Sequence, residues 1–225
     1  MKRHIPNVIT SLNLIAGSVG CFIVIRGDYK HAIYFVLLAA FFDFFDGLAA
    51  RGLKVQSPVG KELDSLADLV SFGVLPAFYL VMAMDSTYPP SYFLKFFSLI
   101  VVVFSAIRLA KFNVDTRQSE QFIGLPTPAN AIFITSLVLL PSNIFLDYWV
   151  LMIIALSTSL LLVSELPLIA LKFKTYRWKS NELRFTLIIT SIVLLGFLRL
   201  SAIPFIIPCY IILSIVGNFT KKNHV

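Results

Sequence analysis

The stretch at residues 43–68 reads DFFDGLAARGLKVQSPVGKELDSLAD and places four aspartates inside a strongly apolar chain. Asp43 and Asp46 stand three residues apart, and Asp64 and Asp68 stand four apart, so each pair lies on one face of a helix. The short polar segment between the pairs folds two helices into a hairpin, which lets all four carboxylates point into one cleft. Because an ionisable side chain at membrane depth is costly, it usually marks a functional site.

The rest of the chain has the composition of a membrane protein. Of its 225 residues, 58% are hydrophobic and 14% are charged, whereas a soluble domain is about half apolar and a quarter charged. The apolar runs predict eight helical spans, at residues 10–26, 32–51, 61–84, 92–112, 127–142, 147–171, 184–199 and 202–219. We therefore expect an all-α, polytopic membrane bundle that forms a single domain over residues 1–225.

The lysines and arginines predict the orientation of this bundle, because they gather in cytoplasmic loops. Fifteen of the nineteen fall at the span ends that include both termini, and the other four are Arg26, Lys30, Lys95 and Arg199. Both termini are therefore expected in the cytoplasm, and the net charge of +7 is a topology signal aided by anionic headgroups. Since the sequence contains no basic, aromatic-rich soluble module, nucleic acid is not an expected partner. Polar residues between positions 7 and 13 argue against a cleaved signal peptide.

The hairpin at residues 43–68 has the composition of a metal and phosphate site. Four clustered carboxylates repel one another unless cations neutralise them, and oxygen ligands without histidine or cysteine favour Mg²⁺ or Mn²⁺. Two such ions ~4 Å apart are a recurring device for phosphoryl displacement. Gly47 and Gly60 leave room for a ligand, Arg51 can grip a phosphate, and Ser57 offers a hydroxyl. The alternative is that the aspartates form interfacial salt bridges with the basic residues of the same hairpin.

The spacing Asp43-x-x-Asp46-Gly47-x-x-Ala50-Arg51, eight residues, Gly60-x-x-x-Asp64-x-x-x-Asp68 resembles the signature of the CDP-alcohol phosphotransferase family. Enzymes of that family displace CMP from a CDP-linked lipid with an alcohol, at a two-metal site on the cytoplasmic side of a membrane. The resemblance implies two divalent cations, Mg²⁺ or Mn²⁺, held by Asp43, Asp46, Asp64 and Asp68. It also implies that Asp68 is the general base. Residues 6–10 resemble the family's pre-span helix that helps hold the cytidine. The implied CDP-lipid site consists of Asn7, Thr10, Gly47, Ala50, Arg51, Ser57 and Gly60.

Two further stretches, IRLAKFN at 107–113 and FIGLPTPANA at 122–131, resemble the phosphatidylserine synthase branch of that family. The resemblance implies that CDP-diacylglycerol and L-serine react to give phosphatidylserine and CMP. Because the serine carboxylate needs a cation, we expect Arg108, Lys111 and Asn113 to bind serine. The alternative is that these residues reach lipid headgroups or pair with Asp115. Gly124 and its neighbouring prolines are expected to shape the following loop.

The resemblance covers about residues 5–131, where we expect the catalytic core, followed by further helices and an extra helix pair at 184–219. It implies a multi-pass protein of the cell membrane, with its active site facing the cytoplasm, among membrane lipids and as a homodimer. Two other functions stay open: the same chemistry with glycerol 3-phosphate or inositol phosphate as the acceptor, and a divalent-cation carrier. Glu165 is expected inside the sixth span, where it either pairs with a basic residue or lines the lipid path.

Overall fold

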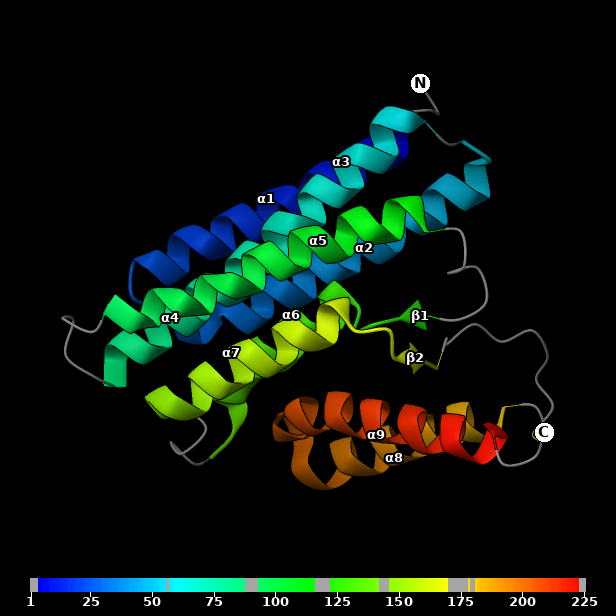
Figure 1. Cartoon of the computed structure of the whole chain (residues 1–225). Coiled ribbons are helices and arrows are strands. Elements are labelled where there is room, and N and C mark those ends of the chain that lie inside the picture. The colour runs from blue at the N-terminus through cyan, green and yellow to red at the C-terminus, as the bar shows by residue number, and fades with distance from the viewer. Residues whose placement is uncertain are drawn as a thin grey trace.

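The computed structural model of the chain is a bundle of helices arranged in three groups (Figure 1). The structure describes residues 4–55, 57–87, 93–115, 122–141, 146–169, 178 and 181–222. The first group contains α1 (Ile5–Ile25), α2 (Ala32–Leu53), α3 (Pro58–Asp68), α4 (Leu75–Thr87) and α5 (Ile100–Val114). The second contains α6 (Thr127–Ser136) and α7 (Tyr148–Val163), and it lies between the first group and the pair α8 (Glu182–Leu198) and α9 (Ile203–Lys222).

Short elements extend or join these helices. The π-helical turn η3 (Leu69–Val74) joins α3 to α4, and the 3-10 turn η9 (Arg199–Ala202) joins α8 to α9. The 3-10 turns η2 (Tyr29–His31), η4 (Phe93–Leu99) and η6 (Leu137–Leu139) extend α2, α5 and α6. Strands β1 (Phe122–Ile123) and β2 (Pro167–Leu168) pair antiparallel, and the sequence patterns did not predict them.

The predicted polytopic helical bundle is confirmed. Among the described residues, five helical runs are long and apolar enough to cross a membrane: Ile5–Ile25, Tyr29–Leu53, Pro58–Ser86, Phe93–Val114 and Glu182–Asn218. The last run contains both α8 and α9, and the shorter apolar helices Thr127–Leu139 and Tyr148–Val163 match the fifth and sixth predicted spans. Each of the eight predicted spans therefore corresponds to a helix.

Two predicted boundaries are wrong by several residues. The first helix begins at Ile5 rather than at residue 10, because the pre-span helix expected at residues 6–10 is continuous with the first span. Pro6 suits the first turn of this longer helix. The sixth ends at Val163 rather than at residue 171, so Glu165 lies beyond the helix and not inside a span. Pro167 explains this early end, since it lacks an N–H and disfavours helical backbone in the residue before it.

One end of the bundle collects most of the connections that concern the site. The start of α1, the α2–α3 turn, the end of α5, both strands and the end of α9 all lie at this end (Figure 1). The start of α1 and the end of α9 therefore share one side, as an even number of spans predicts. Of the fifteen basic residues expected on this side, seven lie outside the described residues: Lys2, Arg3, Arg117, Lys172, Lys174, Arg177 and Lys179.

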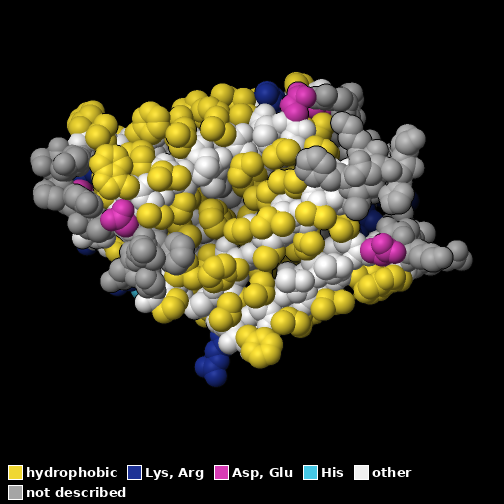
Figure 2. All heavy atoms as spheres, turned by 60° about the horizontal axis from the view of Figure 1, so that its bottom comes forward, with side chains coloured by type: hydrophobic (Ala, Val, Ile, Leu, Met, Phe, Trp, Pro, Cys, Tyr) yellow, Lys and Arg dark blue, Asp and Glu magenta, His cyan; other side chains and the backbone are white. Residues whose placement is uncertain are grey.

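The outer surface is apolar, as a lipid-facing surface must be. Figure 2 shows that the face on the side of α8 and α9 is largely hydrophobic, with charged side chains mostly at its periphery. Helix α1 shows the same arrangement on a smaller scale, because large apolar side chains recur along its exposed face. These are Ile5, Val8, Leu12, Ile15, Val19 and Phe22. The opposite face of α1 buries its small and polar residues against the other helices.

Candidate active site

The turn between α2 and α3 is built by local backbone preferences. Lys54 caps the C-terminal end of α2, and its φ of 52° places it in the left-handed region that commonly closes a helix. Ser57 then caps α3, because its Oγ accepts a hydrogen bond of 2.9 Å from the backbone N–H of Gly60. Pro58 follows at the first helical turn, where its missing N–H costs nothing. This compact turn returns the chain so that the two aspartate pairs meet.

Three of the four aspartates form a tight cluster, which we call the carboxylate trio. Asp43 from α2 and Asp64 and Asp68 from α3 each offer an oxygen, and these oxygens all lie within 4.8 Å of one another. Oδ1 of Asp64 is buried and has no hydrogen-bond partner among the described residues. Buried polar atoms normally have a partner, so the orphaned oxygen indicates that something else binds there. Carboxylate oxygens alone suit a hard divalent cation.

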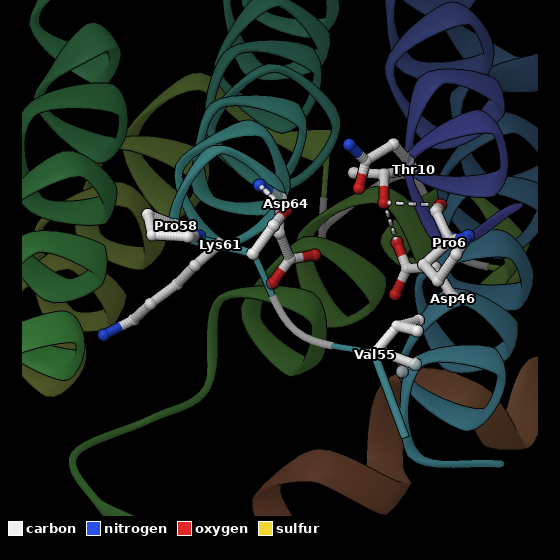
Figure 3. A pocket seen from close by; sticks show the side chains of 12 residues that line it. Pro6, Thr10, Asp46, Val55, Pro58, Lys61 and Asp64 are labelled. Carbon is white, nitrogen blue, oxygen red and sulfur yellow. Dashed lines mark hydrogen bonds between the residues drawn. The ribbon is translucent and has the colours of Figure 1, made fainter. Parts of the chain in front are cut away.

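Asp46 lies beside the trio but is held by a different contact. It is only 6% exposed, and its Oδ2 accepts a hydrogen bond of 2.6 Å from Oγ1 of Thr10 on α1 (Figure 3). It interacts electrostatically with all three members of the trio. The structure therefore brings the four predicted ligands together as three plus one, with Thr10 fixing the fourth.

Asp68 is oriented by a residue that the sequence patterns did not select. Nδ2 of Asn13 on α1 donates a hydrogen bond of 3.1 Å to Oδ1 of Asp68, and Asn13 itself is fully buried. The backbone carbonyl of Asn13 accepts a hydrogen bond of 3.0 Å from Ser71 in η3. A signal for Asn13 exists in retrospect, since Thr10, Asn13 and Gly17 recur at helical spacing on one face. π-Helical turns such as η3 often accompany functional sites.

A cavity of about 610 Å³ opens between α1, α2 and α3 (Figure 3). Its lining includes six of the seven residues predicted to bind the CDP-lipid: Asn7, Thr10, Gly47, Ala50, Ser57 and Gly60. Asp46 and Asp64 also line it, and their carboxylates face the space between the helices (Figure 3). The seventh residue, Arg51, is exposed and not part of the lining. It stands one turn beyond Gly47 on α2, and its guanidinium lies beside Gly47, because a Cβ added to Gly47 would be 3.8 Å from Nη1. The cavity therefore joins the predicted lipid-nucleotide residues to the aspartates.

The basic residues of the hairpin do not neutralise the aspartates. Within the described part of the chain, none of Arg51, Lys54 and Lys61 forms an ion pair with them. Lys61 lines the cavity, but its amine points away from Asp46 and Asp64 (Figure 3) and donates a hydrogen bond of 2.8 Å to the backbone carbonyl of Asn113. The interfacial salt bridges considered as an alternative are therefore not formed among these residues.

The three residues predicted to bind serine separate into two places. Arg108 is buried, its guanidinium carbon lies 5.2 Å from the centre of the Phe112 ring, and it lines a second cavity together with Lys111. Asn113 does not line that cavity. Its side-chain amide donates a hydrogen bond of 2.8 Å to Ser65, which fastens α5 to α3.

The contacts between α5 and the α3–η3 run fix the depth of Arg108. An added Cβ on Gly73 would lie 3.1 Å from Cβ of Ser105, so these two residues touch. Asn113 contacts Ser65 eight residues further along each helix, so the two run antiparallel in matched register. Ala110 then lies level with Asp68, and Arg108 lies within one turn of that depth. Arg108 thus lies near the level of Asp68 along the bundle.

Comparison with known proteins identifies a family and several relatives of this chain. A family model described as CDP-alcohol phosphatidyltransferase matches residues 3–163. A CDP-diacylglycerol–serine O-phosphatidyltransferase of Mycobacterium tuberculosis is 35% identical over 180 residues, which cover 73% of this chain and 60% of that protein. One of the same description from Helicobacter pylori is 31% identical over 224 residues, covering 94% of this chain and 89% of that protein. An archaetidylserine synthase of Methanothermobacter thermautotrophicus is 34% identical over 134 residues, covering 59% of this chain and 56% of that protein. The chain thus spans about 60% of the length of the mycobacterial relatives.

Proposed function

The chain belongs to the CDP-alcohol phosphatidyltransferase family, and we propose that it transfers the phosphatidyl group of CDP-diacylglycerol to the hydroxyl of L-serine, with release of CMP. One observation carries this proposal: Asp64 belongs both to the carboxylate trio and, with Asp46, to the lining of the cavity between α1, α2 and α3, which the predicted lipid-nucleotide residues share. Relatives described as serine phosphatidyltransferases support serine as the acceptor, over glycerol 3-phosphate or inositol phosphate. Family membership argues against a cation carrier.

The donor set fits divalent cations. We assign Asp43, Asp64 and Asp68 as ligands because their oxygens converge, and Asp46 as a further ligand because it lies beside them. The orphaned Oδ1 of Asp64 supports the fit. Two ions, Mg²⁺ or Mn²⁺, would stabilise negative charge on the phosphoryl oxygens and on the departing CMP.

The lipid-nucleotide is held from three helices in this proposal. Asn7 and Thr10 supply polar groups from α1, and Ser57 supplies its hydroxyl at the start of α3. Gly47 gives the pyrophosphate close access to α2, with the cationic Arg51 one turn further on. The acyl chains stay in the bilayer, beside the exposed apolar faces of α1 and α2.

Asp68 is assigned as the general base. The amide of Asn13 occupies Oδ1 of Asp68, which leaves Oδ2 to accept the proton of the serine hydroxyl. The serine oxygen then forms a bond to the lipid-side phosphorus as the bond from that phosphorus to the CMP oxygen breaks. Arg108 and Lys111, which line the second cavity, supply cations for the serine carboxylate. Asn113, already bonded to Ser65, acts on this site only by fixing α5.

The same proposal places the protein in the cell membrane with its site toward the cytoplasm. Its support is the charge count, in which fifteen of nineteen basic residues fall on the side of the aspartate hairpin. The homodimer and the division into a core near residues 5–131 and an extra pair at 184–219 rest on the family resemblance.

The test is CMP release from CDP-diacylglycerol by the purified full chain, measured against serine, glycerol 3-phosphate and inositol phosphate. We expect release that depends on serine and that Asp68→Asn abolishes. Release with another acceptor and not with serine would show that the acceptor is wrong, and no release with any alcohol would overturn the reaction class.

A further inference from the structure

The second cavity carries charges of both signs on different elements. It measures about 280 Å³ and lies between the end of α5, strand β1 and the end of α7. Arg108 and Lys111 line it from α5, Asp115 lines it at the α5 terminus, and Glu165 lines it from the segment after α7. A cavity that offers cations from one wall and a carboxylate from another suits a small zwitterion.

The backbone around Glu165 is fixed on both sides. The N–H of Gly124 donates to the carbonyl of Leu166 at 2.9 Å, and the N–H of Leu125 donates to that of Leu161 at 3.0 Å. Gly124 has a φ of 75°, and a Cβ there would lie 2.7 Å from the Leu162 carbonyl oxygen, so the contact requires glycine. The strand pairing of Ile123 with Pro167 continues these backbone contacts between residues 123–125 and 161–167.

Helix α9 holds the segment that follows Glu165 through three further hydrogen bonds. Tyr210 donates a hydrogen bond of 3.0 Å to the carbonyl of Ile169, and Oγ of Ser214 accepts one of 3.2 Å from the N–H of the same residue. Asn218 donates to the carbonyl of Pro167 at 2.6 Å. Glu165 is therefore placed by a fixed hairpin, although it lies outside any helix.

The two acids of the cavity differ in their surroundings. Asp115 interacts electrostatically with Arg108, so its charge already offsets a cation of the same wall. Glu165 is exposed and forms no ion pair with any residue that the structure describes. Of the two, Glu165 is the carboxylate that a cationic group entering the cavity would meet.

Resting on the serine transfer proposed above, we infer that Glu165 binds the ammonium group of serine while Arg108 and Lys111 bind its carboxylate. An ammonium carries three donors and pairs with an ionised carboxylate. An acceptor alcohol without an amine forfeits this contact, and an anionic one is repelled by Glu165. The residue therefore determines specificity, because selectivity is a difference between two affinities.

The test compares serine with 3-hydroxypropionate, which is serine without its ammonium group. Phosphatidylserine formation is measured over a range of serine concentrations, with 3-hydroxypropionate as a competitive inhibitor, in wild type, Glu165→Gln and Glu165→Asp. In Glu165→Gln we expect kcat/KM for serine to fall roughly five- to thirtyfold, mainly through KM, since the partly exposed site weakens the pairing. Inhibition by 3-hydroxypropionate should stay equal or tighten, because a repulsive charge is gone. Glu165→Asp should recover part of the serine affinity.

Matched controls separate this role from a structural one. Glu182 is an exposed acid at the start of α8. Glu182→Gln should leave unchanged both kcat/KM for serine and the inhibition constant of 3-hydroxypropionate. Equal loss of serine and 3-hydroxypropionate binding in Glu165→Gln would overturn the inference, as would an ammonium-selective loss in Asp115→Asn but not in Glu165→Gln. Wild type that forms no phosphatidylserine would disprove the serine transfer itself, whereas active wild type with an unaltered Glu165→Gln would disprove only the ammonium contact.

Discussion

The side-chain amide of Asn13 donates a hydrogen bond of 3.1 Å to Oδ1 of Asp68, which connects α1 to the carboxylate trio. The contact is fully buried and joins residues that are 55 positions apart. A bond to a charged group at such a site fixes the direction of the carboxylate, so it determines which oxygen is left to accept a proton. In the proposed mechanism Asn13 is a positioning residue, since it would act on the reaction through Asp68.

Removing that amide should impair catalysis more than substrate binding. In Asn13→Ala we expect kcat to fall roughly ten- to a hundredfold, as a hydrogen bond to a charged group contributes about 1.5–3 kcal/mol. The KM for CDP-diacylglycerol should change little, because Asn13 does not line the lipid-nucleotide cavity. Steady-state kinetics with both substrates varied checks this. A rise in KM with unaltered kcat would contradict the positioning role.

The hydroxyl of Thr10 should matter through Asp46. Thr10→Val keeps the shape of the side chain but removes the donor of the 2.6 Å bond, and so leaves a buried carboxylate with one partner fewer. We expect activity to fall roughly tenfold or more, and the concentration of Mg²⁺ or Mn²⁺ needed for half-maximal activity to rise. Thr10→Ser keeps the hydroxyl and should retain most activity. Both variants are compared by measuring turnover as the metal concentration is varied. Equal activity in both variants would show that the bond to Asp46 has no functional role.

The four aspartates of the hairpin should each be required. Asp43→Asn, Asp46→Asn, Asp64→Asn and Asp68→Asn each remove a charge from the proposed metal site, and we expect turnover to be abolished in all of them. EDTA should inactivate the wild type, and added Mg²⁺ or Mn²⁺ should restore it. The matched control is Asp28→Asn, which alters an exposed aspartate paired with His31 between α1 and α2 and should stay active. Full activity in EDTA would contradict the metal assignment.

The residues that sequence reasoning could find are those that short-range spacing brings together. Asp43 with Asp46, and Asp64 with Asp68, are one helical turn apart, so their convergence follows from helix geometry and one tight turn. The eight helical spans were likewise predicted from a local property, the length of the apolar runs in the sequence. Asn13 was not found because its function depends on the crossing of α1 over η3, a tertiary contact that no local pattern specifies.

The placement of Glu165 was missed for a related reason. Its neighbours are apolar, so hydropathy alone extended the sixth span to residue 171. The structure ends the helix at Val163 because Pro167 and the pairing of β1 with β2 favour extended backbone there. Two-residue strands are too short to show an alternating pattern, and their partners are separated by more than forty residues.

The orientation of the bundle can be tested with single cysteines. Lys54 and Ser86 are both exposed and lie at opposite ends of the α3–α4 run. In a chain whose Cys21 and Cys209 are replaced by serine, we expect a membrane-impermeant maleimide to label Ser86→Cys on intact cells. Lys54→Cys should react only after the membrane is permeabilised. Labelling of Lys54→Cys on intact cells would contradict the charge count and the access of a cytoplasmic nucleotide-lipid.

The close crossing of α1 and η3 leads to a prediction about stability. A Cβ on Gly17 would lie 2.2 Å from Oγ of Ser71 and 2.8 Å from its Cα. The second distance involves backbone, so turning the Ser71 side chain cannot relieve the overlap. Helix α1 would have to move away from η3, and the hydrogen bond from Ser71 to the Asn13 carbonyl would lengthen. Since Asn13 also orients Asp68, the displacement should reach the site.

We therefore expect Gly17→Ala to destabilise the protein by about 1–3 kcal/mol, the usual cost of forcing an extra carbon into a packed core, and to lower kcat as well. The measurements are Tm in detergent and CMP release. Gly196→Ala is the matched control, because nothing lies within 4 Å of a Cβ there and alanine favours helix more than glycine, so its Tm should hold or rise. If Gly17→Ala had the wild-type Tm and kcat, α1 could separate from η3 without cost, and the close crossing would not be what aligns Asn13 with Asp68.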